Sequence, residues 1–203
     1  MPEEMQNLEK YLSDSRDLYL QIKNKVDTCA KTSLSLFVVD SAKFSKATKE
    51  LVNVLCNDHE LPGIYLTTNK PYESLMQSFT DHGIKTDRLL FIDCISQTVK
   101  PEIAIKGKHY FIDSPSDLTQ LEIAIQKAVS KMPQGGIFII LDSISTLLIY
   151  NKREVVERFV HLLATKIRAK PNTRGIFIAI DSHEEESFID NISQFCDYAI
   201  KID

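Results

Sequence analysis

The stretch GGIFIILDS, residues 135–143, decides how the rest of the sequence is interpreted. Two glycines precede five apolar residues, Ile137 to Leu141, and the run ends in Asp142 and Ser143. A short run that is apolar at every position is typical of a strand buried on both faces, since a half-buried strand would alternate with polar residues. A sheet that is buried on both faces needs helices on both sides. The run therefore predicts a central strand in an α/β fold.

Similar apolar runs recur along the chain and alternate with helical patterns. We expect further strands at 34–39, 63–67, 89–93, 109–112, 175–180 and 198–202. We expect helices at 3–28, 44–56, 71–82, 151–169 and 187–194, and one more that Ser114 caps, Pro115 opens and Pro133 ends. This order predicts a three-layer α/β/α domain over residues 31–203 with a mainly parallel sheet.

Two segments lie outside this alternation. Residues 1–30 form an N-terminal helix that either covers the domain or serves as a docking arm. Residues 96–108 contain a proline, a glycine and the basic residues Lys100, Lys106 and Lys108, which predicts an exposed excursion from the domain.

Composition excludes several classes of protein. The formal net charge is −4 and the isoelectric point is about 5.8, whereas nucleic-acid binders usually carry a basic patch, so a nucleic-acid partner is not expected. The longest apolar run has five residues, far short of the roughly 20 that cross a bilayer, so we expect no membrane partner. The start of the chain is acidic and polar, and the four cysteines are widely spaced, as in reduced cytoplasmic proteins.

Three segments resemble the RecA superfamily and, within it, its KaiC-like branch. The strand that ends in Asp142 and Ser143 resembles the Walker B strand. Residues 62–84 resemble the strand, loop and helix that come earlier in that family, and residues 196–203 resemble its late edge strand. The resemblance extends over residues 34–203 and implies a RecA-like fold, an ATP site at the carboxyl ends of the strands and head-to-tail assembly.

The sequence departs from this family where phosphate would be held. A P-loop needs glycines, because its backbone N–H groups must wrap the phosphates, yet no glycine precedes Gly63. If Lys46 takes the place of the motif lysine, Asp40 replaces the first glycine and Ala47 the hydroxyl that binds Mg²⁺. Thr48 follows one position too late. A carboxylate about 4 Å from phosphate costs about 4 kcal/mol at an effective dielectric constant near 20.

The acidic pair that would polarise the attacking water is also replaced, by Asn69 and Lys70. We therefore expect no catalytic residue, no metal site and no cofactor, with ATP and Mg²⁺ disfavoured. The candidate remnants of the nucleotide site are Lys43, Lys46, Thr48, Asp142 and Ser143.

These observations favour a regulatory or interaction subunit that has lost ATPase activity and pairs with itself or with an intact relative. One alternative is an ATP-binding protein or weak ATPase, with Lys43 or Lys46 on phosphate and Asp142 on Mg²⁺. Another is a receiver-like switch that accepts a phosphoryl group where Asp40, Asp93 and Asp142 converge. Against the switch stands a simpler interpretation, in which aspartates at strand ends cap the helices that follow.

Three further features were weighed as sites. The five histidines are too scattered for a zinc site, and Cys94 is the one cysteine at a strand end, where a nucleophile would lie. The acidic run from His183 to Glu186 either faces water or meets a basic edge of a neighbouring subunit.

Overall fold

In a computed structural model, residues 3–96 and 109–202 are described, with side chains described from Ser15 onward. The strands are β1 (Ser33–Val39), β2 (Gly63–Thr67), β3 (Leu89–Asp93), β4 (His109–Phe111), β5 (Ile137–Asp142), β6 (Thr173–Ile180) and β7 (Tyr198–Ile202). They form one sheet in the order β4-β3-β2-β5-β6-β1-β7, and each pairing is parallel. The strand with which the sequence analysis began, β5, lies at the centre of this sheet.

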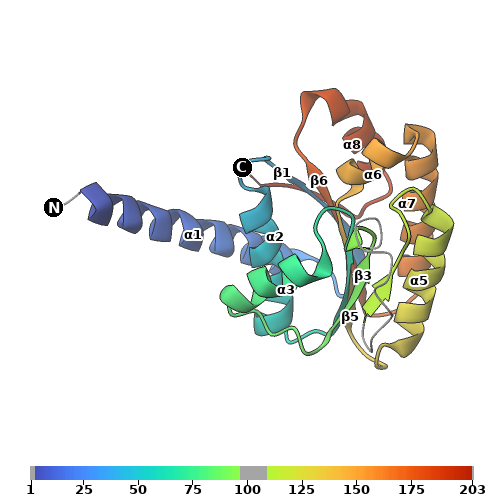
Figure 1. Ribbon diagram of the computed structural model, residues 1–203, viewed down its shortest axis with the longest axis horizontal. Helices are drawn as coiled ribbons and strands as arrows, with labels where there is room; N and C mark the ends of the chain where they lie inside the picture. Colours follow the sequence, from blue (N-terminus) through green and yellow to red (C-terminus); the bar gives the residue numbers. More distant parts are fainter. Residues whose placement is uncertain (1–2, 97–108, 203) are drawn as a thin grey trace.

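Helices cover both faces of the sheet, as the sequence predicts (Figure 1). The α1–α3 layer consists of α1 (Glu3–Thr28), α2 (Phe44–Asn53) and α3 (Tyr72–Asp81), together with the π-helical turn η1 (Val54–Asp58). The opposite layer consists of α5 (Leu118–Lys131), α6 (Ile144–Tyr150), α7 (Arg153–Arg168) and α8 (Glu186–Ser193), with the 3₁₀ turn η2 (His183–Glu185) before α8.

Successive side chains of β5 pack alternately against the two helical layers. Ile137, Ile139 and Leu141 belong to the apolar cluster that α5 and α7 cover. Phe138 and Ile140 belong to the cluster under α1 and α2. All five are buried, because side chains alternate between faces and each face has its own helices.

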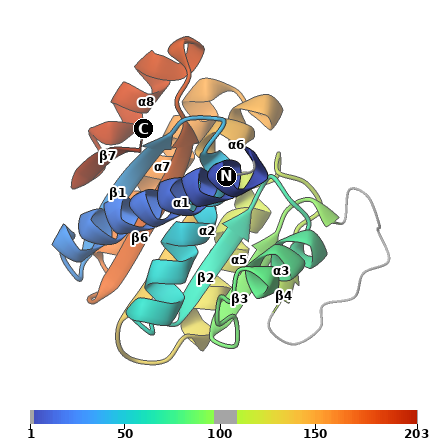
Figure 2. The ribbon, with the colours of Figure 1, turned by 90° about the vertical axis from the view of Figure 1, so that its left-hand side faces the viewer.

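The second half of α1 packs against the domain. Leu18, Ile22 and Val26 recur every four residues and are buried against the α2 side of the core. The hydroxyl of Tyr19 donates to Asp58 at 2.7 Å, which ties α1 to η1. The first half projects away from the body (Figure 1), and Figure 2 views the molecule from the side on which the N-terminus lies. The covering role is confirmed for the second half, and a docking role for the first half stays a prediction.

One helix begins later than predicted. The cap predicted at Ser114 is wrong, because α5 begins at Leu118 and Asp117 is its N-cap. The Asp117 carboxylate accepts a hydrogen bond from the N–H of Gln120 at 2.8 Å, which is the bond an N-cap makes. The Ser114 hydroxyl lies 2.8 Å from that of Ser116 instead.

At two other places the observed helices are divided differently from the predicted ones. The segment predicted as one helix over 44–56 changes at Val54 from α-helix to the π-helical turn η1. The helix α6 was not predicted as a separate element; Ser143 caps it, and extended backbone at Asn151 ends it before α7. The predicted excursion at 96–108, with Lys100, Lys106 and Lys108, lies outside the described residues except for Ser96.

Candidate functional site

The carboxyl ends of β1, β2 and β5 share one edge of the sheet, because the strands are parallel. We call this the carboxyl edge. Ligands of open α/β sheets usually bind at such an edge, and the predicted remnants of the nucleotide site lie there. The strand order puts β2 beside β5 and puts β6 between β5 and β1.

The turn between β1 and α2 uses its own backbone N–H groups. The carboxylate of Asp40 accepts from the N–H of Ala42 at 2.8 Å, and its carbonyl accepts from the N–H of Lys43 at 3.0 Å. The carbonyl of Ser41 accepts from the N–H of Phe44 at 3.4 Å. In a P-loop, N–H groups at this place point at phosphate. Here these three are bonded within the turn.

The three remnants on and before α2 have different surroundings. Lys43 is exposed and occupies the N-cap position without a side-chain cap, and no acidic residue lies in the first turn of α2. Lys46 is half-buried, and its N–H bonds to the carbonyl of Lys43 at 3.0 Å. Thr48 is buried, and its hydroxyl has no hydrogen-bond partner within the described part of the chain.

Lys70, which follows β2, reaches across to α2. Its ammonium donates to the hydroxyl of Ser45 at 3.1 Å. The loop that carries Lys70 is held by Thr67, whose hydroxyl donates to the Lys70 carbonyl at 2.6 Å and lies 3.1 Å from the Lys70 N–H. The charge of Lys70 also lowers the pKa of Asp142. A cation of the protein itself therefore lies between the first turn of α2 and the end of β5.

Asp142 is a buried carboxylate with one oxygen bonded and one free. The Tyr65 hydroxyl donates to Oδ2, whereas Oδ1 has no partner among the described residues. Burial raises the pKa of Asp142 to about 6, against the opposing effects of Tyr65 and Lys70. Burial, and then Asp142, hold the pKa of Tyr65 well above its usual value, so this hydroxyl remains a donor at neutral pH.

Ser143 and Thr68 complete a buried network beside Asp142. The Thr68 hydroxyl accepts from the N–H of Ser143 at 3.0 Å and lies 3.1 Å from the Asp142 carbonyl. The Ser143 hydroxyl accepts from the N–H of Thr146 at 3.2 Å and so caps α6. The role of Ser143 in this structure is to start a helix.

The aspartates that a receiver-like switch would need do not gather. Four strand spacings of about 4.8 Å separate β1 from β3, which puts Asp40 and Asp93 roughly 19 Å apart. Both oxygens of Asp93 are bonded, Oδ2 to the N–H of Tyr72 at 2.7 Å and Oδ1 to that of Ile95 at 2.7 Å. The simpler interpretation, that these aspartates cap the helices that follow them, is wrong for Asp40, because α2 has no side-chain cap and the Asp40 carboxylate bonds the N–H of Ala42 in the turn before it.

The remaining candidates are Cys94, a metal site and the acidic run from His183 to Glu186, and none of them forms a reactive site among the described residues. Cys94 is fully buried, and burial raises the pKa of its thiol, so it is a core residue rather than a nucleophile. Within residues 3–96 and 109–202, no three His, Cys, Asp or Glu side chains are grouped to hold a metal ion. Of the acidic run, Glu184 and Glu186 are exposed.

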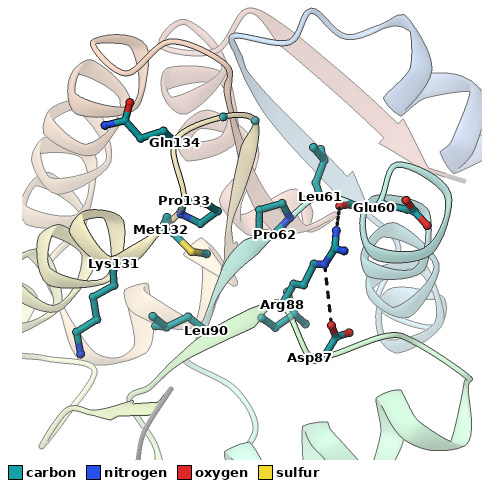
Figure 3. A pocket seen from close by; sticks show the side chains of 13 residues that line it. Glu60, Leu61, Pro62, Asp87, Arg88, Leu90, Lys131, Met132, Pro133 and Gln134 are labelled. Carbon is teal, nitrogen blue, oxygen red and sulfur yellow. Dashed lines mark hydrogen bonds and ion pairs between the residues drawn. The ribbon is translucent and has the colours of Figure 1, made fainter.

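A cavity of about 650 Å³ lies at the opposite edge, where β2, β3 and β5 begin (Figure 3). We call it the amino-edge cavity. It is larger than the 260 Å³ cavity between β7 and α8. Its lining is Glu60, Leu61, Pro62, Asp87, Arg88, Leu89, Leu90 and residues 131–136. This cavity was not predicted from the sequence, because the ligand site was expected at the carboxyl ends of the strands.

The structure thus brings Asp142 and Ser143 together with residues that the sequence analysis did not count as a site. Lys70 was noted only as a poor replacement for a catalytic acid, and Ser45, Tyr65 and Thr68 were not singled out. The threonine pair at the end of β2, Thr67 and Thr68, was the available signal, because hydroxyls at a strand end are placed to bond neighbouring loops. Tyr65 lies in the middle of β2, and nothing in the sequence marked it as part of a site.

Comparisons with known proteins agree on the fold. No curated protein matches the chain. The crystal structure of the KaiC-like protein PH0186 from Pyrococcus horikoshii OT3 is similar, with a TM-score of 0.59 and 11% identity over 85% of this chain and 72% of that one. The uncharacterized protein PH0321 from Pyrococcus horikoshii, solved in complex with an unknown peptide, gives a TM-score of 0.67 and 12% identity over 89% of this chain and 81% of that one.

These likenesses support the RecA/KaiC-like fold expected from the sequence. Among the described residues, no helix is both long and apolar enough to span a membrane. The model of a family described as "Family of unknown function (DUF7504)" matches residues 35–202.

Proposed function

For a chain that belongs to DUF7504, a family of unknown function, we propose a protein-binding, regulatory role without ATP hydrolysis. The protein would use a KaiC-like fold as a scaffold and pair with itself or with a relative that retains its ATPase. The fold alone carries no function, so the proposal rests on the carboxyl edge.

The observation that carries the proposal is the ammonium of Lys70, bonded to Ser45 at 3.1 Å and close enough to Asp142 to lower the pKa of its carboxyl. In a RecA-like ATPase, Mg²⁺ and phosphate would lie between the first turn after β1 and the aspartate that ends β5. A lysine that supplies this positive charge itself removes the need for a metal ion at Asp142. Mg²⁺ placed beside the ammonium would be repelled.

The turn after β1 supports the same conclusion. Its N–H groups at Ala42, Lys43 and Phe44 are already bonded, so a triphosphate would have to break these bonds. The carboxylate of Asp40 lies in the same turn and would repel each phosphate. Phosphoryl transfer depends on positioned phosphate contacts and Mg²⁺, and both would have to be built anew.

A protein partner fits the remaining observations. The similar protein PH0321 was crystallised with a peptide, which makes protein binding a natural use of this fold. The first half of α1 projects from the body and offers an arm for such contacts (Figure 1). Nucleic acid is not proposed as a partner, because the net charge of the chain is −4.

Calorimetric titration with ATP and Mg²⁺ tests the loss of nucleotide binding, with an intact RecA-type ATPase as positive control. We expect no heat of binding and no phosphate release at concentrations up to about 1 mM. Light scattering of the same sample reports whether the chain self-associates. Micromolar binding of ATP with turnover would overturn the proposal. If the chain is monomeric, self-association is excluded and pairing with another protein is the form of the proposal that stands.

One observation favours the alternative of an ATP-binding protein. Lys43, Lys46 and Lys70 surround the first turn of α2 without a nearby acidic residue in that turn, and anions bind favourably at helix N-termini. This alternative predicts that ATP and Mg²⁺ raise the melting temperature and that Asp142→Ala abolishes the rise. Absence of any rise in the wild-type protein removes it.

A further inference from the structure

The amino-edge cavity is enclosed by loops that come from three parts of the chain. One loop precedes β2, the second precedes β3, and the third, residues 131–136, joins α5 to β5. Figure 3 shows the first two beside each other and the third opposite them. A volume of about 650 Å³ lies within the range of 300 to 1,000 Å³ that is typical of small-molecule sites.

Unusual backbone conformations shape two of these loops. Glu60 has φ 51°, in the left-handed region that residues with a side chain rarely adopt. It follows the π-helical turn η1, a conformation frequently found at functional sites, and the N–H of Leu61 donates to the carbonyl of Leu55 at 3.0 Å. In the opposite wall, Gly135 has φ 145°, which favours glycine. Such conformations persist where the surrounding structure maintains them.

The surface of the cavity is mostly apolar. Leu61, Pro62, Leu90, Met132 and Pro133 contribute to its lining. The two walls meet closely where Gly136 faces Leu61: a Cβ atom on the glycine would lie 3.2 Å from Leu61 Cδ2. A side chain at this position would require Leu61 to shift by a few tenths of an ångström, so the two walls pack closely at this junction.

Arg88 is the cation in this apolar surface. One of its Nη atoms donates to the carbonyl of Glu60 at 3.1 Å, which links the two loops that lie beside each other on one side of the cavity (Figure 3). Asp87 forms a long ion pair with it, with the carboxylate 4.0 Å from Nε, which is beyond hydrogen-bond distance (Figure 3). The guanidinium has five N–H donors, so it retains donors for a ligand. The Glu60 carboxylate is 3.9 Å from Lys85 and turns away from the hollow.

The second cation of the lining, Lys131, is directed elsewhere. Its ammonium lies over the ring of Tyr110, 4.8 Å from the ring centre. This leaves Arg88 as a largely exposed, planar cation beside an apolar surface. A guanidinium pairs with planar oxyanions such as carboxylates through parallel hydrogen bonds.

We propose that the amino-edge cavity binds a small molecule with an apolar body and one anionic group, which pairs with Arg88. Its apolar body would cover Met132 and Leu90. This site is independent of the proposed function, because it lies at the edge of the sheet opposite Lys70 and Asp142.

Fluorescence titration with 1-anilinonaphthalene-8-sulfonate, an aromatic sulfonate, tests the site in the full chain. We expect saturable binding of one probe per chain, displaced by 4-phenylbutyrate. The uncharged 4-phenylbutyramide should displace the probe about tenfold less well, because it cannot form the charge-assisted bond.

Two variants and a matched control locate the site. Arg88→Gln should weaken probe binding about tenfold or more, and Met132→Trp should abolish it by filling the hollow. Arg158→Gln, at an exposed arginine on α7, should leave binding unchanged. Thermal melts of all three show whether they are folded.

Two results would overturn the proposal. One is the absence of saturable binding to the wild-type protein. The other is binding that survives both Arg88→Gln and Met132→Trp, since the probe would then lie elsewhere. If Arg88→Gln fails to fold, Met132→Trp and the comparison of carboxylate with amide still decide the matter.

Discussion

The two edges of the sheet differ in how their polar groups are satisfied. At the carboxyl edge, Asp142, Tyr65, Thr68 and Ser143 bond one another in a buried network, and Lys70 supplies a positive charge from within the chain. At the amino edge, Arg88 lies in an open cavity of about 650 Å³ with few protein partners. Under this account, the edge where the fold family would bind its ligand has become structural, and the opposite edge retains room for one.

The largest effect expected at the carboxyl edge is the pH dependence due to Asp142. Its folded pKa of about 6 lies above the usual 3.8, so the folded protein holds this proton more tightly than the unfolded chain. The contribution to stability is full below about pH 4 and is lost as the pH rises through 6, a change of about 3 kcal/mol. Asp142→Asn removes it.

Urea unfolding of wild type and Asp142→Asn between about pH 4 and pH 7 measures this change. The stability of wild type relative to the variant should fall across the range. A constant difference would mean that Asp142 is not a desolvated carboxyl, and the contrast between the edges would weaken.

The next effect comes from the Thr68 hydroxyl. Thr68→Val keeps the shape of the side chain but leaves the buried N–H of Ser143 without its partner at 3.0 Å. We expect a loss of about 2 kcal/mol in the free energy of unfolding, since a buried donor without a partner costs about 1–3 kcal/mol. Thr80→Val, at an exposed position in α3, is the matched control and should cost less. If Thr68→Val and Thr80→Val lose the same free energy of unfolding, the Thr68 hydroxyl does not stabilise the buried network.

Lys70→Met should have a smaller effect on stability, about 1 kcal/mol or less, because the side chain is only half-buried. Its clearer consequence is on Asp142, whose pKa should rise further without the ammonium that lowers it. The pH at which stability changes should therefore move upward, as repeated unfolding curves would show. If the midpoint of the pH-dependent change in stability is the same in Lys70→Met and wild type, Lys70 does not influence Asp142.

At the amino edge, Arg88→Gln should change the free energy of unfolding by less than about 0.5 kcal/mol, because the arginine side chain is 60% exposed and its contacts are weak. Chemical denaturation at neutral pH is sufficient to measure it. A loss as large as that of Thr68→Val would show that Arg88 is structural, and the two edges would then not differ as described.

Much of the fold could be predicted from the sequence, because the strands are apolar runs with definite ends. β3 and β7 have the predicted limits, and β5 is one residue longer than predicted. The helix boundaries were harder, since several residues can cap one start: Ser114 and Asp117 both suit a cap, and only the chain path decides for Asp117. The π-helical turn η1 left no periodic signal.

The candidate sites were less predictable than the fold. The end of β5 was located through Asp142, but its partners come from β2 and the loop after it, and sequence spacing does not indicate which side chains cross between elements. Lys70 was read as a missing acid, whereas its bond to Ser45 depends on the position of α2. The amino-edge cavity depends on three loop conformations, of which only Gly135 and Gly136 had a sequence signal.

The central claim is that the turn after β1 is closed to phosphate, and the backbone amide spectrum of the isotope-labelled protein tests it most directly. On addition of ATP and Mg²⁺ up to about 5 mM, the account predicts no saturable shift of the N–H signals of Ala42, Lys43 and Phe44. Saturable shifts of these signals, together with those of Lys70, would contradict it.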